Sequence, residues 1–332
     1  MTRRPSNTTV GVALVTFAVV AATPLWAAPA VTRLMVDVLV VVAATVLWAS
    51  IASAARVVVI GLHGFAGLGA ATLVVLTERA DLNPVLAVGG AGVVAAAVAL
   101  AATPVLLRAA PAVALLASWS LAELLRAIVL QVPALGGRTP RALDAVAELG
   151  GASDGIVAWL AVVVGLGAVA AVYAFRRSRL GLALAAERDD EPAARSLGLP
   201  VGRARWLIVV IAAAGLAMAG ATVRLREGVV DTDVAFGVVR WSLVPLVLAS
   251  LGGYRSIEGP VLAAVLYVAV ARIAGGHDLA VSGFFACAAL GVIVAFGPGG
   301  LWGLVQRVAP VELFPLRRWF DENAPREAAR RR

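Results

Sequence analysis

Long apolar runs, each interrupted only by a short segment rich in arginine, glycine or proline, recur along this chain. About 20 consecutive apolar residues let an α-helix cross the hydrocarbon core of a membrane. Hydrophobic residues make up 61% of the 332 residues and charged residues 14%, against about 25% charged residues in soluble domains. Such a chain cannot cover itself with polar surface in water. The pattern therefore predicts an all-α polytopic membrane protein.

Cutting the sequence at its charges and its Gly/Pro clusters gives about ten candidate transmembrane helices. They lie near residues 10–28, 34–54, 57–76, 85–107, 111–132, 156–175, 206–223, 236–252, 259–274 and 280–297. The third and ninth are short and interrupted by glycine, as expected where broken helices or re-entrant segments line a pathway. Residues 10–304 are thus expected to form one transmembrane domain between a cytoplasmic N-terminus, 1–9, and a cytoplasmic tail, 305–332.

The distribution of arginine predicts the orientation in the membrane. With the N-terminus in the cytoplasm, 19 arginines fall in inside segments and 6 in outside loops. Because basic residues favour the cytoplasmic side, both termini and the loop 176–205 are expected to lie inside. The N-terminal run could instead be a cleaved signal peptide, since Arg3 and Arg4 precede it and small residues such as Ala27 and Ala28 follow. Its length argues against that alternative.

The composition also excludes several classes of function. All 28 basic residues are arginine, so the lysine of a phosphate-binding loop is missing and the chain is not itself a P-loop ATPase. The arginines lie in loops between apolar runs, which favours anionic lipid over nucleic acid as their partner. The single Cys287 cannot form an intrachain disulfide or a thiolate metal cluster. Neither a zinc-binding His-Glu-x-x-His helix nor a Gly-x-Ser-x-Gly elbow is present, so we expect no catalytic residues and no metal site.

The loop 176–205 carries two predicted short helices. The first begins near Leu180. The second is capped by Asp189 or Asp190 and has Pro192 in its first turn. A left-handed residue after this helix is expected to end it, and glycine adopts that conformation most readily.

The second helix has the features of a docking element. Ala193, Ala194 and Leu197 are spaced to share one face, and Gly198 is the expected C-terminal stop. Small side chains on such a face let the backbone of another protein approach closely. An ordinary linker helix at the membrane interface is the alternative.

Matched positions through this loop carry a family resemblance. They are Arg177-Ser178, Gly181, Ala183-Leu184, Ala186, Arg188, Asp190-Glu191, Ala193-Ala194 and Leu197-Gly198. The segment resembles the cytoplasmic coupling loop of ABC-importer permeases, and more narrowly that of the Liv-type branched-chain amino acid permease family, M-type subunit.

Weaker similarity extends over about residues 57–303. It includes residues 63–70, 119–126, 251–260 and 298–303. Arg255 replaces a glycine of the family pattern. The family's extracytoplasmic Gly-Gly-Ser-Asp-Gly element corresponds to residues 136–139 by spacing or to 150–155 by composition.

The resemblance implies a transmembrane permease subunit in the plasma membrane that moves branched-chain or related amino acids by alternating access. It implies ABC ATPase subunits, a second permease subunit in a homo- or heterodimer, and an extracytoplasmic solute-binding protein as partners. ATP would be hydrolysed by the partner subunits, and no cofactor would be bound by this chain. The ATPase would dock on Glu191, Ala193, Ala194, Leu197 and Gly198. Alternatives are another small solute such as urea or a sugar, an ion-coupled secondary transporter, or a non-transporting membrane scaffold.

Charged side chains inside predicted spans form a further group of candidates. Glu123 and Arg126 lie three residues apart and hence on one helix face, and each unpaired charge would cost about 2.5–3.5 kcal/mol at the bilayer centre. They are expected either to form an ion pair that holds helices together or to lie in the translocation pathway. Asp37 invites the same two interpretations. Arg240 and Arg272 lie near span ends and are expected to snorkel.

His63 begins a glycine-rich segment. Its neighbours Gly64, Gly67 and Gly69 permit either tight helix packing or a backbone opening toward solute. Together with Glu123, these residues are the candidates for the substrate pathway.

Overall fold

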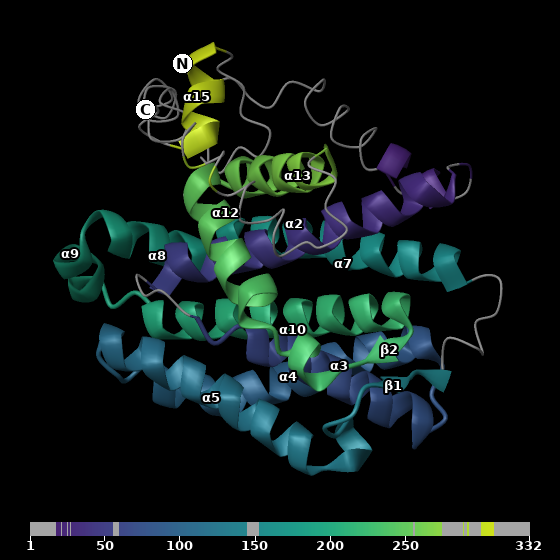
Figure 1. The fold of residues 1–332 in the computed structure, drawn as a ribbon. Helices are drawn as coiled ribbons and strands as arrows, with labels where there is room; N and C mark the ends of the chain where they lie inside the picture. Colours follow the sequence, from purple (N-terminus) through teal and green to yellow (C-terminus); the bar gives the residue numbers. More distant parts are fainter. Residues whose placement is uncertain are drawn as a thin grey trace, which may run out of the picture.

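The computed structural model describes residues 28–55, 60–144, 153–254, 256–273 and 300–308, with isolated residues at 18–20, 22–24, 26, 288 and 291. The described part is helical, as predicted (Figure 1). Its α-helices are α2 (Pro29–Ala55), α3 (His63–Glu78), α4 (Pro84–Leu106), α5 (Pro111–Gln131), α7 (Ser153–Arg177), α8 (Arg179–Asp189), α9 (Glu191–Ser196), α10 (Val201–Glu227), α11 (Thr232–Ala235), α12 (Val244–Gly252), α13 (Glu258–Ile273) and α15 (Gly300–Val308). A 3₁₀ turn, η1 (Pro133–Leu135), and a π-turn, η3 (Val239–Leu243), complete the helical elements. Strands β1 (Arg141–Ala142) and β2 (Val229–Val230) form one short antiparallel pair.

Six segments of the described part are long and apolar enough to cross a membrane. They are Pro29–Ala54, Pro84–Leu106, Ala112–Gln131, Ser153–Arg177, Val201–Glu227 and Thr232–Gly252. The predicted spans at 57–76 and 259–274 become α3 and α13, which have 16 residues each. A helix of that length extends about 24 Å, less than the roughly 30 Å hydrocarbon core. Of the eight predicted spans that fall in the described residues, six are thus long enough to cross a membrane and the two predicted to be short are not, whereas the predicted spans 10–28 and 280–297 lie largely outside the described residues.

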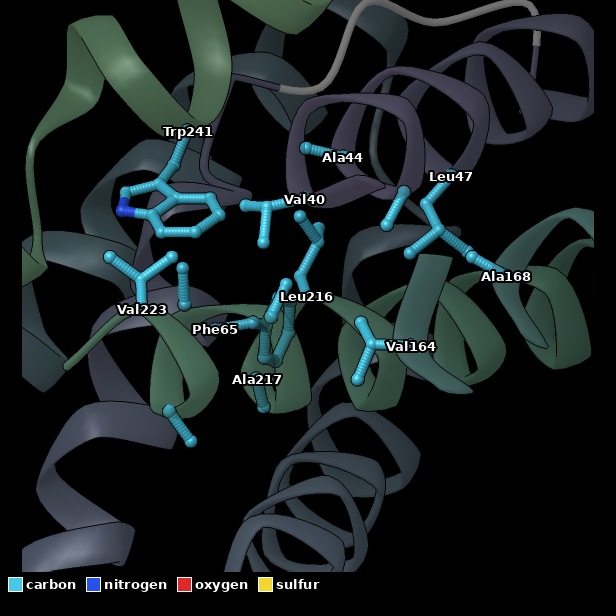
Figure 2. Close-up of a cluster of buried hydrophobic side chains, with 14 of the residues drawn as sticks. Val40, Ala44, Leu47, Phe65, Val164, Ala168, Leu216, Ala217, Val223 and Trp241 are labelled. Atoms are coloured by element: carbon cyan, nitrogen blue, oxygen red, sulfur yellow. The ribbon is translucent and has the colours of Figure 1, made fainter. Parts of the chain in front are cut away.

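Helix α10 forms the centre of the bundle. It packs against α3 and α4 on one side and against α2 and α7 on the other (Figure 1). Figure 2 shows side chains of α2, α7 and α10 meeting in this core, among them Leu47, Val164 and Leu216. Small residues bring the helices close together, since a Cβ added at Gly220 would lie 2.2 Å from the carbonyl oxygen of Ala66 in α3.

One predicted span is interrupted. Residues 232–252 form α11, then η3, then α12. A π-turn inserts an extra residue into the helical ladder and is common at functional sites, and Pro245 follows it in the first turn of α12. The turn directs Trp241 into the core beside Val40 and Val223 (Figure 2). A broken helix is thus present, as the sequence predicted for a pathway, but in the eighth candidate span.

At each end of the bundle lie segments that the predicted topology places on the same side of the membrane. We call the two ends the β1 end (residues 29–37, 76–84, 132–142, 224–231 and 272–273) and the α9 end (residues 50–55, 106–111, 176–205, 251–254 and 256–257). At the β1 end, Arg141 forms an ion pair with Glu78. At the α9 end, Arg205 Nε donates to the carbonyl oxygen of Ala54 over 3.3 Å. Each contact joins segments that were predicted on the same side of the membrane. Which of the two ends faces the cytoplasm remains a prediction.

The proposed start of the C-terminal tail at residue 305 falls inside a helix. Helix α15 continues to Val308, and Leu301 in its first turn is buried against α12 and α13. The predicted boundary between domain and tail thus lies within α15.

Candidate functional site

Helix α8 fixes the first half of the loop 176–205 to the bundle. Its N-cap is Ser178, whose hydroxyl accepts a hydrogen bond from the backbone N–H of Gly181 over 3.2 Å. At its other end, both carboxylate oxygens of the buried Glu187 accept from Nη2 of Arg205, at 2.8 and 2.9 Å. Since Arg205 also binds the last turn of α2 through Ala54, it joins α8, α10 and α2 at one point.

Helix α9 has the local design predicted from the sequence. It begins at Glu191, directly after the extended residue Asp190, and Pro192 occupies its first turn. The chain then reaches Gly198 at φ +65°, and Leu199 N–H donates back to the carbonyl oxygen of Ala194 over 3.3 Å. A left-handed glycine with this returning hydrogen bond is a common way to end a helix.

The exposed surface of α9 differs from the expected shared face. Ala194 is 2% exposed, whereas Leu197 is 74% exposed. The reason is that α9 ends at Ser196, so the helical spacing that would align the two side chains does not reach Leu197. Ala194 therefore packs toward the protein, and Leu197 is the most exposed large apolar side chain among the described residues of the loop. The side chain of Ala193 lies outside the described part of the structure.

His63 opens α3 in a fully buried position beside the π-turn. Its Nδ1 lies 3.1 Å from the carbonyl oxygen of Ile60 and 3.2 Å from Oγ of Ser242 in η3. The backbone N–H of His63 donates to the same Oγ over 3.1 Å, and that hydroxyl donates in turn to Ile60. The other ring nitrogen, Nε2, is buried and has no hydrogen-bond partner among the described residues.

Glu123 lies opposite that nitrogen. Its Oε1 is 3.7 Å from His63 Nε2 and accepts a 3.4 Å hydrogen bond from Trp119 Nε1. Its Oε2 accepts from Nη1 of Arg126 over 3.1 Å, which confirms the ion pair expected from the i, i+3 spacing. Nη2 of Arg126 also reaches Oδ1 of Asp233 in α11, at 2.6 Å. We call His63, Glu123, Arg126, Asp233 and Ser242 the α5 polar cluster.

The glycines after His63 provide close helix packing. An added Cβ at Gly64 would lie 2.7 Å from Ala122 in α5, and one at Gly67 would lie 2.3 Å from the ring of Phe236. At Gly69 it would lie 2.1 Å from the carbonyl oxygen of Ala217 in α10. These contacts bear out the packing role. Whether the same segment also lines a pathway remains a prediction.

The remaining membrane charges form ion pairs at the β1 end. Asp37, which is 7% exposed, pairs with Arg226 of α10 and with Arg272 of α13, the latter at 2.6 Å. Arg240 lies 3.2 Å from Glu227. Snorkelling alone therefore does not describe Arg240 and Arg272.

Sequence reasoning missed four members of these sites. Ser242 and Asp233 come from the segment that the π-turn breaks, and only the folded chain brings them to α3 and α5. Glu187 and Arg205, which are 18 residues apart in the sequence, join α8 to α10. The available signals were a serine inside the predicted span 236–252 and an aspartate just before that span.

The described residues contain no group of three or more His, Cys, Asp and Glu side chains that could hold a metal ion. Of the two alternatives for the family's glycine element, Gly136 and Gly137 lie in a turn with positive φ angles. Residues 150–152 of the other alternative are outside the described part.

Comparison with known proteins gives one family. A family model described as a branched-chain amino acid transport system permease component matches residues 30–276. Neither the curated proteins nor the solved structures contain a match. The matched range includes the loop 176–205, the α5 polar cluster and, apart from Pro29, all six candidate spans. The chain belongs to the family of permease components of branched-chain amino acid transport systems, and it is thus a multi-pass transmembrane component rather than an ATPase.

Proposed function

We propose that this chain is the permease subunit of an ABC importer for branched-chain or related amino acids in the plasma membrane. The observation that carries the proposal is the loop 176–205, in which a short helix presents Leu197 outward beside the left-handed Gly198. ABC ATPase subunits would bind there and hydrolyse ATP. A solute-binding protein would deliver solute at the β1 end. Family membership supports both kinds of partner.

The coupling route is proposed to begin at α9 and to pass through Arg205. This side chain binds Glu187 in the helix before α9 and the last turn of α2. Helix α2 is the most deeply buried candidate span, with 78% of its most apolar stretch buried. A displacement of α9 would therefore reach the core of the bundle through one partly buried ion pair and one hydrogen bond, as alternating access requires.

The outer surface of α5 is proposed to face the translocation pathway and the second permease subunit. Only 17% of its most apolar stretch is buried. Glu123 and Arg126 on this helix are 40% and 36% exposed in the isolated chain. Charges facing lipid at this depth would cost about 2.5–3.5 kcal/mol each, whereas a watery pathway between two subunits would solvate them. His63 and the segment Gly64–Gly69 would form the wall behind Glu123.

Retention of the ATPase tests the docking proposal. Leu197→Glu places a charge on the exposed apolar side chain of the loop and should release ATPase subunits during purification of the complex from membranes. The matched control is Val229→Glu, because Val229 is 42% exposed but lies at the β1 end. Equal retention in both variants would contradict docking at this loop.

A further inference from the structure

Nε2 of His63 is a buried ring nitrogen that has no hydrogen-bond partner among the described residues. We infer that it is a proton-binding site, which takes up a proton through the carboxylate of Glu123 and then forms an ion pair with that carboxylate. The ion pair ties α3 to α5. This inference goes beyond the proposed function, because it concerns a proton held by the chain and not the solute that the chain carries.

The surroundings of the other ring nitrogen determine where the neutral ring carries its hydrogen. Nδ1 lies 3.1 Å from the carbonyl oxygen of Ile60, which can only accept a hydrogen bond. Oγ of Ser242 lies 3.2 Å from Nδ1, but the hydroxyl donates its own hydrogen to the same carbonyl oxygen. Nδ1 therefore carries the hydrogen, and Nε2 of the neutral imidazole has a lone pair.

This lone pair can be satisfied by a proton but not by solvent. The side chain of His63 is 0% exposed, so a water molecule does not reach Nε2. Oε1 of Glu123 lies 3.7 Å from Nε2, and a carboxylate oxygen is likewise an acceptor. Two acceptors that face one another repel. A proton on Nε2 needs no cavity, and it converts this repulsion into an attraction between opposite charges.

Glu123 connects the buried nitrogen with water. Its side chain is 40% exposed, so a proton from water can bind the carboxylate and pass from it to the lone pair of Nε2. The products are an imidazolium and a carboxylate, and a hydrogen bond between such groups is about 2.7–2.9 Å long. A small rotation of the Glu123 side chain closes the distance, because the two helices already touch beside it: an added Cβ at Gly64 would lie 2.7 Å from Ala122.

The other charges on the helices around α3 have partners of their own. The charged residues of the elements packed against α3 are Glu123 and Arg126 of α5, Asp233 of α11, Arg240 of η3, and Arg203, Arg205, Arg224, Arg226 and Glu227 of α10, whereas α4 and η1 have none. Arg224 and Arg240 both pair with Glu227. Arg126 binds the second oxygen of Glu123, so its positive charge opposes protonation of His63 and partly offsets the effect of the carboxylate.

Protonation joins three elements at one residue. The backbone N–H of His63 donates to Oγ of Ser242 in the π-turn, and the protonated Nε2 adds the bond to Glu123 on α5. If α5 faces the translocation pathway, the wall of that pathway is held more firmly when the proton is bound. This consequence for transport rests on the proposed function, whereas the proton site itself does not.

Solid-state ¹⁵N NMR of the full chain in lipid bilayers tests the site. The chain carries ¹⁵N-labelled histidine and the substitution His277→Gln, which leaves His63 as its one labelled ring. At high pH, Nδ1 should be protonated and Nε2 not. As the pH falls, Nε2 should gain a proton while Nδ1 keeps its own. A neutral ring with its hydrogen on Nε2 would overturn the inference, and so would an Nε2 that stays unprotonated down to about pH 4, where carboxylates themselves become protonated.

Glu123→Gln assigns the proton affinity to the carboxylate. The variant keeps the shape of the side chain but removes its charge, so Nε2 of His63 should gain its proton at a pH at least about one unit lower than in the parent. Asp154→Asn is the matched control, because Asp154 is 56% exposed and pairs with Arg33 at the β1 end. It should titrate like the parent. A protonated Nδ1 at high pH reports in each variant that the ring is still in place. Equal titration of Glu123→Gln and the parent would contradict the site.

Thermal unfolding tests whether the proton ties the two helices together. The ion pair stabilises the fold only where His63 is protonated, which is below its titration midpoint. The loss of Tm in Glu123→Gln should therefore be larger about one pH unit below that midpoint than about one unit above it. The bond of Glu123 to Arg126 is lost at both pH values and cancels in this comparison. An equal loss at both pH values would show that the proton does not join α3 to α5.

These measurements can fail independently of the importer proposal. They use the chain without ATPase, solute or solute-binding protein. Equal ATPase retention in Leu197→Glu and Val229→Glu would contradict docking and leave the proton site standing. A His63 ring that does not titrate would remove the proton site and leave docking at the loop 176–205 untouched.

Discussion

Nη2 of Arg126 in α5 lies 2.6 Å from Oδ1 of Asp233 in α11, 107 residues further along the chain. The contact closes α11 against α5, and the same guanidinium binds Glu123. Asp233 is 63% exposed and Glu123 40%, so the three charges lie at the surface of a transmembrane helix. They are paired with one another and remain accessible.

Substitutions of Arg126 and Glu123 are expected to lower stability unequally. Arg126→Gln leaves two carboxylates without their common cation, whereas Glu123→Gln leaves the pair of Arg126 with Asp233 intact. Arg126→Gln should therefore lower the free energy of unfolding more, by about 1 kcal/mol, because partly exposed pairs contribute little. The double variant should recover part of that loss. Thermal unfolding of the four proteins in detergent measures this, and additive losses would contradict pairing.

Substitution of Asp37, at the β1 end, is expected to lower the free energy of unfolding by a larger amount. Asp37→Asn leaves two arginines facing a neutral side chain in a buried position, and should cost about 3 kcal/mol, the lower end of the range for a broken buried pair. Arg272→Gln should cost less than about 1 kcal/mol, because Arg226 still pairs with Asp37 and Arg272 is half exposed. Thermal midpoints of the two variants give the comparison. Equal losses would contradict the expectation that Arg226 alone can hold Asp37.

Two glycines allow a comparison between a position in tight helix packing and a position with open space around it. Gly69→Ala forces a Cβ to within 2.1 Å of the backbone of α10 and should prevent normal packing of α3. Gly167→Ala in α7 meets no atom within 4 Å, and should be neutral or slightly stabilising because alanine favours helix by up to about 1 kcal/mol. The yield of monodisperse protein after membrane extraction checks both. Normal yield of Gly69→Ala would mean that α3 and α10 are further apart than described.

The sequence predicts the helical elements well but not how the broken segment folds. Apolar runs and arginine spacing locate α2, α4, α5, α7 and α10, and local signals at Asp190, Pro192 and Gly198 predict α9 and its end. The pairing of Asp233 with Arg126 and the contact of Ser242 with His63 depend on how α11 and η3 pack. No local pattern encodes such contacts. The burial of Ala194 was missed for a related reason, since periodicity within six residues does not say which face meets the bundle.

Labelling from outside tests the orientation. On a Cys287→Ala background, Ser196→Cys at the α9 end should resist a membrane-impermeant thiol reagent in intact cells. Arg138→Cys at the β1 end should react, because both side chains are exposed and differ only in the predicted side of the membrane. The opposite pattern would reverse the orientation and exclude an ATPase at α9.

The coupling of ATP hydrolysis to uptake through α9 is the central claim, and one paired measurement tests it most directly. Gly198 and Gly202 both have open space around an added Cβ, but only Gly198 has a left-handed backbone. Valine at 198 is strained by about 1–2 kcal/mol, whereas valine at 202 continues α10. In proteoliposomes that contain the complete transporter, solute taken up per ATP hydrolysed should fall about ten-fold in Gly198→Val and stay at the parental value in Gly202→Val. An unchanged ratio in Gly198→Val, with the ATPase still bound, would contradict coupling through this loop.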